Sequence, residues 1–162
     1  MRRSLMHRRG LWHHGADVWI YNSKGEVLVQ KRSMKKRTNP GLWTGSATGH
    51  VPAGETPRQS AVRELYEEIG VSAKPKELKE IIKTILVEEI GSRYHNREHL
   101  HVYLCKRDVD ARNFKLQKEE VSAVKFVPFS RFRKEINDPQ LAKKYVRTIY
   151  YPELIKKLGE VT

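Results

Sequence analysis

The sequence predicts a mixed α/β layered domain, because β-rich runs both precede and follow a central helix and more helix is expected at the end. No internal repeat, low-complexity segment or Pro/Gly/Ser-rich linker interrupts the 162 residues. A chain of this length buries roughly 70% of the surface that it exposes when unfolded, which is enough for a real core. We therefore expect one domain over residues 1–162.

A β-hairpin is expected first. Residues 16–22 (ADVWIYN) and 26–32 (EVLVQKR) are β-rich and are joined by Ser-Lys-Gly, which is a turn signal. Residues 39–55 are dense in Gly, Pro, Ser and Thr, so they predict a loop with short extended pieces. A helix is then expected from about residue 57 to residue 69.

The remaining elements are three strands and a helical tail. Strands are expected over 78–89, 100–107 and 121–129, and a helix over 138–159 that Pro152 interrupts. Cys105 is the only cysteine, so an internal disulfide and a CxxC metal site are excluded. Because Cys105 lies in a predicted strand, we expect a buried structural thiol rather than a nucleophile.

The central helix is bounded at both ends by its own sequence. Thr56 is a good N-cap, Pro57 suits the first helical position, and Gln59 completes a capping-box pattern. Gly70 is the expected residue just past the C-terminus. Apolar residues recur at every fourth position on this helix and predict its core-facing side: Ala61, Leu65 and Ile69.

Three carboxylates share another side of the helix. Glu64, Glu67 and Glu68 stand at positions i, i+3 and i+4, within roughly 100° of arc. Like charges this close destabilise a bare helix, whereas a hard divalent cation prefers oxygen ligands and offsets their repulsion. Taken alone, the cluster fits a metal site or an ordinary acidic surface equally well.

The surrounding residues favour the metal site. A glycine, five residues, a glutamate, seven residues and Arg-Glu-apolar-any-Glu-Glu-any-Gly-apolar form the Nudix box, and the segment 49–71 resembles it at all nine specified positions. Chance agreement is on the order of 10⁻⁹ per starting position. The matching residues are Gly49, Glu55, Arg63, Glu64, Leu65, Glu67, Glu68, Gly70 and Val71.

Resemblance to the Nudix family implies a Nudix-type α/β/α sandwich with a mixed β-sheet and a loop–helix–loop catalytic motif. It also implies that Glu64, Glu67 and Glu68 bind Mg²⁺, or Mn²⁺ in its place, with the Gly49 carbonyl as a further ligand. The ion would polarise the phosphoryl oxygens of a diphosphate and activate water. Arg63 and Glu55 look like the family's ion pair, to which we assign a scaffolding role.

A further carboxylate acts as base or ligand in some Nudix enzymes. Glu98 precedes the strand 100–107, while Glu119 and Glu120 precede the strand 121–129. Each of them could equally be a solvated charge at a strand edge. The general base is therefore left open between Glu64, Glu98 and Glu120, with Glu98 also a candidate metal ligand.

The resemblance extends beyond the box to the branch that contains isopentenyl-diphosphate isomerase and its hydrolase relatives. The shared features are the hairpin, a Gln-x-Arg-Ser strand end and a loop with Pro40, Gly41 and Trp43. The isomerase uses a cysteine two residues before the histidine that matches His50, and this chain has Thr48 there. Threonine is too weak an acid to protonate an alkene, so isomerase activity is disfavoured.

The same branch has a histidine-rich metal site. His7, His13, His14 and His50 resemble its metal-binding histidines, and Glu98 matches one of its carboxylate ligands. Three histidines and a carboxylate suit Mn²⁺ or Zn²⁺. The alternative, which we favour, is that His13 and His14 open a strand and His50 is a loop residue near the phosphates.

Aromatic and basic residues give weaker signals. Trp19 alternates with apolar neighbours and is expected in the core, whereas Trp43 fits a substrate pocket and packing equally well; Trp12 is a further candidate for stacking. Four cations lie between the hairpin and the box, where they could receive phosphates, although a solvated charge run is favoured: Arg32, Lys35, Lys36 and Arg37.

Net charge and the absence of long apolar runs bound the partners and the compartment. The net charge of +13 favours polyanionic partners, yet the lysines are scattered, so a specific nucleic-acid site is possible but not favoured. No apolar run approaches the ~20 residues of a membrane span. The basic residues at the start are not followed by an apolar stretch, so we do not expect a secretory signal. We expect a cytoplasmic protein, as a monomer or a homodimer.

The hypothesis carried forward is an Mg²⁺-dependent hydrolase. Its expected substrate is a nucleoside diphosphate linked to another group, or another small diphosphate. An isomerase and a basic RNA-binding or RNA-processing protein are the alternatives.

Overall fold

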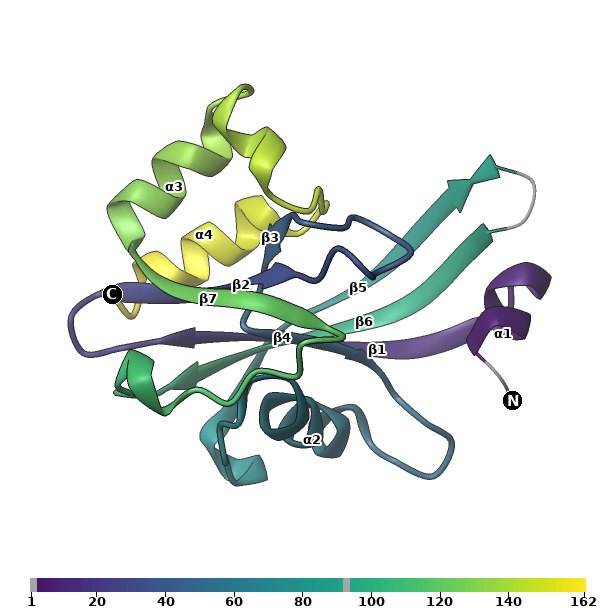
Figure 1. Ribbon diagram of the computed structural model, residues 1–162, viewed down its shortest axis with the longest axis horizontal. Helices are drawn as coiled ribbons and strands as arrows, with labels where there is room; N and C mark the ends of the chain where they lie inside the picture. The colour runs from purple at the N-terminus through teal and green to yellow at the C-terminus, as the bar shows by residue number, and fades with distance from the viewer. Residues whose placement is uncertain (1–2, 92–93) are drawn as a thin grey trace.

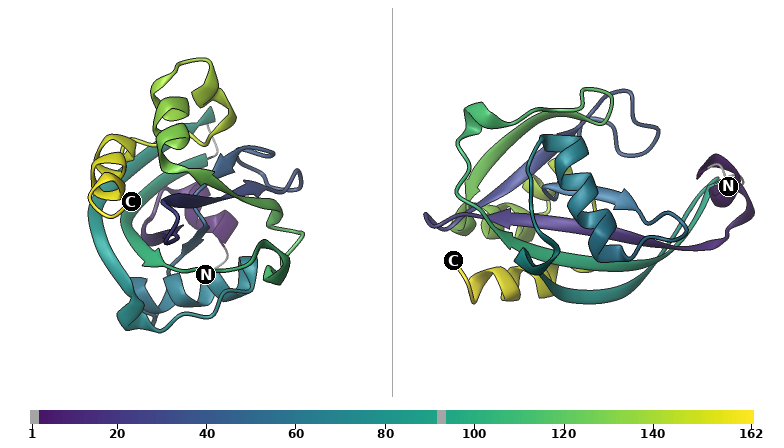
Figure 2. Two further views of the ribbon diagram at one scale, coloured as in Figure 1. Left: turned by 90° about the vertical axis from the view of Figure 1, so that its left-hand side faces the viewer. Right: turned by 90° about the horizontal axis from the view of Figure 1, so that it is seen from below.

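The computed structural model describes residues 3–91 and 94–162 and has three layers. A curved mixed sheet lies between helix α2 (Pro57–Ile69) on one face and helices α3 (Phe129–Asn137) and α4 (Tyr151–Gly159) on the other (Figures 1 and 2). This arrangement confirms the expected α/β/α sandwich.

The described residues form a seven-stranded sheet with the order β3-β2-β1-β6-β5, in which β4 also pairs with β1 and β7 with β2. β1 and β6 are parallel over ten residue pairs and the other pairings are antiparallel, so the sheet is mixed. The strands are β1 (Trp12–Tyr21), β2 (Glu26–Arg32), β3 (Trp43–Thr44), β4 (Ala47–His50), β5 (Leu78–Ile90), β6 (Tyr94–Lys106) and β7 (Val121–Pro128).

Strands β1 and β2 diverge soon after their turn. Their registered pairs are Ile20 with Leu28 and Tyr21 with Val27, whereas β4 pairs with the earlier part of β1. Ser46 bridges the fork, since its Oγ accepts from the Ile20 N–H at 2.7 Å and donates to the Leu28 carbonyl at 2.7 Å. The fork leaves an opening that a side chain from α2 can enter.

Each face of the sheet has its own apolar cluster. On the α2 face, Ala61, Leu65 and Ile69 are fully buried, which confirms the predicted core-facing side of that helix. On the opposite face, Trp19 packs with Phe132 of α3 and with the side chains of α4, so Trp19 is a core residue as expected. The sheet, including β1 and β4, is therefore packed on both faces by apolar side chains.

The helix predicted over 138–159 is present only from Tyr151 to Gly159 and is wrong for the residues before it. Residues Leu141–Lys144 form a short 3-10 helix (η4), an extended segment follows, and α4 begins only at Tyr151. Pro152 lies in the first turn of α4, where its missing N–H costs nothing, so it helps to begin the helix rather than interrupting it.

Several boundaries also differ from expectation. β1 begins four residues earlier than predicted and β6 six residues earlier, while α1 (Arg3–Arg9) and α3 were not anticipated. Two further 3-10 helices are Pro75–Glu77 (η1) and Ala111–Asn113 (η3). Within residues 3–91 and 94–162, no helix is both long and apolar enough to cross a membrane.

Candidate active site

Helix α2 is fixed at both ends as its sequence predicts. The Thr56 hydroxyl accepts from the Gln59 N–H at 3.3 Å, and the Gln59 side chain accepts from the Thr56 N–H at 2.9 Å. Gly70 has a φ of 75°, and its N–H donates to the Tyr66 carbonyl at 2.9 Å. These contacts set the phase of the helix and therefore the direction in which each carboxylate points.

Glu68 reaches into the fork between β1 and β2. Its side chain is buried, and one carboxylate oxygen accepts from the Gln30 amide at 2.6 Å and from the Thr48 N–H at 3.1 Å. Burial raises its pKa to about 8, with the charges of Glu64 and Glu120 adding to the effect. A divalent cation at this carboxylate would reverse the shift, because it stabilises the ionised form.

Glu64 lies directly against the backbone of β4. A Cβ built on Gly49 would be 2.2 Å from the carboxyl carbon of Glu64, so only glycine allows this approach. Glu64 and Glu68 therefore converge on two consecutive residues, Gly49 and Thr48.

Arg63 joins the carboxylates to the preceding loop. Its guanidinium donates to Glu64 at 2.8 Å and to Glu67 at 2.9 Å, and its Nε lies 3.2 Å from Glu55. Ser60 also donates to Glu55 at 2.6 Å. The predicted ion pair is present, and its position fits a scaffolding role. Glu67 is the most exposed of the three helical carboxylates, at 48%.

The two additional carboxylates lie in different places. Glu120, just before β7, pairs with Lys36 and contributes to the raised pKa of Glu68. Glu98 is buried on β6, accepts from the Asn96 amide at 3.2 Å, and lies over Gly15, where a Cβ would overlap its carboxylate. The structure therefore brings Glu120 to the carboxylates of α2, while Glu98 belongs to a second cluster.

That second cluster contains three of the four histidines considered from the sequence. His7 of α1, His13 of β1 and His50 of β4 offer ligand nitrogens that all lie within 4.8 Å of one another. His13 and His50 stack with their ring centroids 4.7 Å apart. His14 points to the other face of the sheet and contacts His101 at 3.1 Å, so it is not part of the cluster.

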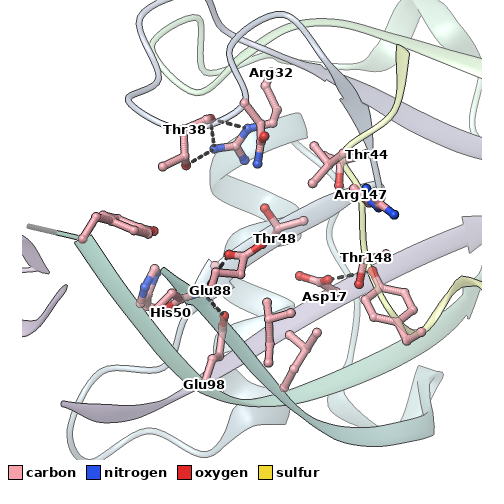
Figure 3. A pocket seen from close by; sticks show the side chains of 18 residues that line it. Asp17, Arg32, Thr38, Thr44, Thr48, His50, Glu88, Glu98, Arg147 and Thr148 are labelled. Carbon is pink, nitrogen blue, oxygen red and sulfur yellow. Dashed lines mark hydrogen bonds between the residues drawn. The ribbon is translucent and has the colours of Figure 1, made fainter. Parts of the chain in front are cut away.

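A pocket is lined by His50 and Glu98 of the second cluster and by Thr48 and Gly49, the β4 residues that Glu68 and Glu64 approach (Figure 3). Its lining reaches from Thr48, Gly49 and His50 across the sheet face to the segment before α4. The other residues that line it are Asp17, Arg32, Thr38, Asn39, Thr44, Leu86, Glu88, Tyr94, Asn96, Glu98, Leu100, Val146, Arg147, Thr148 and Tyr150.

The basic run before the box is only partly a solvated face, contrary to the favoured interpretation. Arg32 lines the pocket and donates to the Thr38 carbonyl at 2.9 Å. Lys35, Lys36 and Arg37 line a neighbouring hollow together with acidic and aromatic residues. The full lining of this hollow is His7, Lys35, Lys36, Arg37, Thr38, Tyr94, Glu119 and Glu120. Cationic side chains thus lie beside Glu119 and Glu120, and Lys36 pairs with Glu120.

Three other residues considered from the sequence are Cys105, Trp43 and Trp12, and none of them lines the described pocket. Cys105 is buried in the core on the α2 face, which raises the pKa of its thiol. Trp43 packs on the core of the opposite face, with the ammonium of Lys125 4.1 Å from its ring centroid, and does not line the described pocket. Trp12 is half exposed beside His99.

Three pocket residues had no signal in the sequence analysis. Asp17 lay unnoticed in a predicted strand, and Thr148 and Tyr150 lay in a segment expected to be helical. Gln30 was also missed as a partner of Glu68, although a polar side chain in an otherwise apolar strand run could have drawn attention to it.

Comparison of the chain with known proteins identifies its family. The chain matches the NUDIX domain over residues 11–149. It is 41% identical to Nudix hydrolase 3 of Arabidopsis thaliana over 81% of the chain, but it spans only 18% of that protein. An uncharacterized Nudix hydrolase of Pseudomonas aeruginosa is 33% identical over 96% of the chain and 81% of its own length.

The relatives also include isopentenyl-diphosphate isomerases, the branch that the sequence resembles. Isopentenyl-diphosphate Delta-isomerase 2 of Photorhabdus laumondii is 29% identical over 95% of the chain and 81% of its own length. A solved structure from Deinococcus radiodurans has a TM-score of 0.69 at 18% identity, covering 98% of this chain and 89% of that one. The MutT protein of Methanosarcina mazei gives 0.64 at 20% identity, covering 92% and 94%. The chain belongs to the Nudix hydrolase family.

Proposed function

We propose that this protein is an Mg²⁺-dependent pyrophosphohydrolase that cleaves the P–O–P linkage of a nucleoside diphosphate derivative or another small diphosphate. The observation that carries the proposal is the convergence of Glu64 and Glu68 on Gly49 and Thr48 of β4. Arg32 and Arg147 line the pocket that Thr48 and Gly49 also line, and Lys35, Lys36 and Arg37 line the neighbouring hollow, so groups that attract phosphate lie near the acidic metal ligands.

The donor set suits a hard divalent cation. Carboxylate and carbonyl oxygens are the ligands that Mg²⁺ prefers, and Mn²⁺ accepts the same set. The ligands we assign are Glu64, Glu67, Glu68 and the carbonyl of Gly49. When bound, the ion polarises the phosphoryl oxygens and lowers the pKa of bound water.

The residues of the chain divide the remaining tasks. Arg63 keeps Glu64 and Glu67 in place, and Gln30 orients the Glu68 carboxylate. We assign water activation to Glu64 or Glu120, because Glu98 lies on β6 beside Asn96 and belongs to the histidine cluster. Cations bordering the site bind the phosphates of the substrate, with Arg32 facing the pocket itself.

The histidine cluster supports a second divalent ion. Three imidazole nitrogens within 4.8 Å of one another suit Zn²⁺ or Mn²⁺ better than Mg²⁺. We propose that His7, His13 and His50 hold it, with Glu98 as the neighbouring carboxylate. His50 and Glu98 line the same pocket as Thr48 and Gly49, the two residues on which the α2 carboxylates converge, so a second ion would add positive charge near the substrate.

Isomerase activity is the second candidate, because isopentenyl-diphosphate isomerases are among the relatives. Thr48 stands where that chemistry needs a thiol, and Cys105, the only cysteine, is buried on the α2 face of the sheet. Incubation with isopentenyl diphosphate should therefore yield no allylic product, and formation of that product would favour the isomerase.

Nucleic-acid binding is the third candidate and rests on the net charge of +13. If RNA binding were the main function, affinity should fall steeply with salt and no metal-dependent phosphate release should occur.

The proposal is tested by a turnover screen. Purified protein is incubated with a panel of diphosphates and Mg²⁺, and phosphate and pyrophosphate products are scored with and without EDTA. We expect EDTA-sensitive hydrolysis that Glu68→Gln lowers by at least about 100-fold. Glu153→Gln, in α4, is the matched control and should retain full activity. Equal rates for Glu68→Gln and wild type would exclude the metal assignment.

A further inference from the structure

The pocket is continuous with the proposed metal site through strand β4. Thr48 donates its backbone N–H to Glu68, and Thr48 also lines the pocket. Asp17 of β1 is the registered partner of Thr48, so the two side chains leave the sheet on the same face. A diphosphate held at α2 would therefore extend its attached group over Asp17.

The lining of this pocket is strongly polar. Among its described residues, the purely aliphatic side chains are those of Leu86, Leu100 and Val146, and most of the others carry hydroxyl, amide, carboxylate or guanidinium groups. An isoprenyl chain would satisfy none of these groups. Burying polar groups without partners costs free energy, so such a ligand fits poorly.

Asp17 is held by a chain of buried hydrogen bonds. The Trp19 indole donates to the Tyr150 hydroxyl at 3.2 Å, and that hydroxyl donates to Asp17 Oδ2 at 2.7 Å. Because an indole N–H can only donate, the Tyr150 proton is directed toward Asp17. Burial, together with the charge of Glu98, raises the pKa of Asp17 to about 7. The carboxyl group is thus fixed in orientation.

Thr148 supplies a second polar group at the same end. Its Oγ1 is buried, and it has no hydrogen-bond partner among the described residues. Thr148 and Asp17 both line the pocket (Figure 3). Buried polar atoms are nearly always paired in folded proteins, so an unpaired one that faces a pocket points to a ligand.

We infer that Asp17 and Thr148 bind a hydroxyl-bearing, sugar-like group attached to the diphosphate and select against isoprenyl diphosphates. Sugar hydroxyls donate to the Asp17 carboxyl group and exchange hydrogen bonds with Thr148, which can both donate and accept. The inference rests on the proposed function in one respect, namely that the diphosphate lies at α2.

Titration calorimetry with Ca²⁺ in place of Mg²⁺ keeps a divalent ion at the α2 carboxylates and tests the inference without requiring turnover. The probes are ADP-ribose and isopentenyl diphosphate, and the proteins are wild type, Asp17→Leu, Thr148→Val and the control Thr162→Val. Wild type should bind ADP-ribose at least about tenfold more tightly than isopentenyl diphosphate. Each pocket variant should lose about tenfold in affinity for ADP-ribose and none for isopentenyl diphosphate, whereas the control should match wild type.

Three outcomes would overturn the inference. They are no binding of ADP-ribose, equal or tighter binding of isopentenyl diphosphate, and equal weakening of both probes by the folded pocket variants. Thr148→Val is isosteric, so it provides the test if Asp17→Leu does not fold. Selective sugar binding without hydrolysis would refute the proposed function alone, and hydrolysis that prefers isoprenyl diphosphates would refute this inference alone.

Discussion

At the scale of single residues, Gly49 and Asp17 are the positions whose surroundings constrain the site most closely. Gly49 is needed because the Glu64 carboxylate occupies the space of a Cβ. Asp17 is a carboxyl group in a setting that favours its protonated form. Gly49 lies on β4 and Asp17 on β1, and these strands are packed between the two apolar clusters.

Gly49→Ala should displace Glu64 and lower turnover by at least about tenfold, because a Cβ there would be 2.2 Å from the Glu64 carboxyl carbon. Steady-state kinetics and Mg²⁺ titration measure the effect. Gly159→Ala is the control, since a Cβ at that helical position meets Phe129 at an ordinary 3.6 Å. Normal activity in Gly49→Ala would mean that the position of Glu64 does not matter.

Asp17→Asn should change how stability depends on pH. The folded pKa of about 7 lies above the ordinary 3.8, so the folded state retains this proton more strongly than the unfolded state. The stabilisation is fully present below about pH 4 and is lost as pH rises through 7. Relative to wild type, Asp17→Asn should therefore gain stability between pH 4 and pH 8, by at most about 4 kcal/mol.

Urea unfolding of both proteins across that range measures the difference. The exposed Asp110, whose pKa is lowered by Arg112, provides a control variant, Asp110→Asn, with a small effect of opposite sign. A difference between wild type and Asp17→Asn that does not change with pH would contradict the assigned shift.

The sequence predicts some site residues and not others for a physical reason. Glu64, Glu67 and Glu68 stand on one helix, so helical geometry alone brings them together, and Arg63 reaches Glu55 over a short loop. Asp17 and Tyr150 are 133 residues apart and meet only because α4 packs on the sheet. No local pattern encodes such a contact.

At the scale of elements, α2 is the part of the fold that its own sequence determines most fully. Its boundaries at Pro57 and Ile69 match the expected helix, because a capping box and an αL glycine act locally at its two ends. The tail shows the opposite case. The rings of Tyr150 and Tyr151 pack against each other and around Trp19, and this tertiary contact overrides the helical pattern before Tyr151.

Thr56→Ala should remove one half of the capping box and lower the free energy of unfolding by about 1 kcal/mol. Chemical denaturation measures the loss. Ser122→Ala, which removes an exposed hydroxyl with only long contacts to β2, is the control and should change stability by less than about 0.5 kcal/mol. A Thr56→Ala protein as stable as wild type would show that packing alone holds the N-terminus of α2.

At the scale of the whole molecule, the layers explain how one helix can supply a metal site. The fork between β1 and β2, bridged by Ser46, admits Glu68 from the α2 side to the backbone of β4. The opposite face of the same strands lines the pocket. The proposed metal ligands and the pocket therefore meet at β4, where Thr48 donates its N–H to Glu68 and also lines the pocket.

The most direct measurement for this account is calorimetric titration of Mg²⁺ into wild type, Glu68→Gln and the exposed control Glu160→Gln. Wild type and Glu160→Gln should bind Mg²⁺ alike, and Glu68→Gln should bind it at least about tenfold more weakly. Identical binding by all three proteins, or no uptake by wild type, would contradict the claim that α2 holds a catalytic divalent ion.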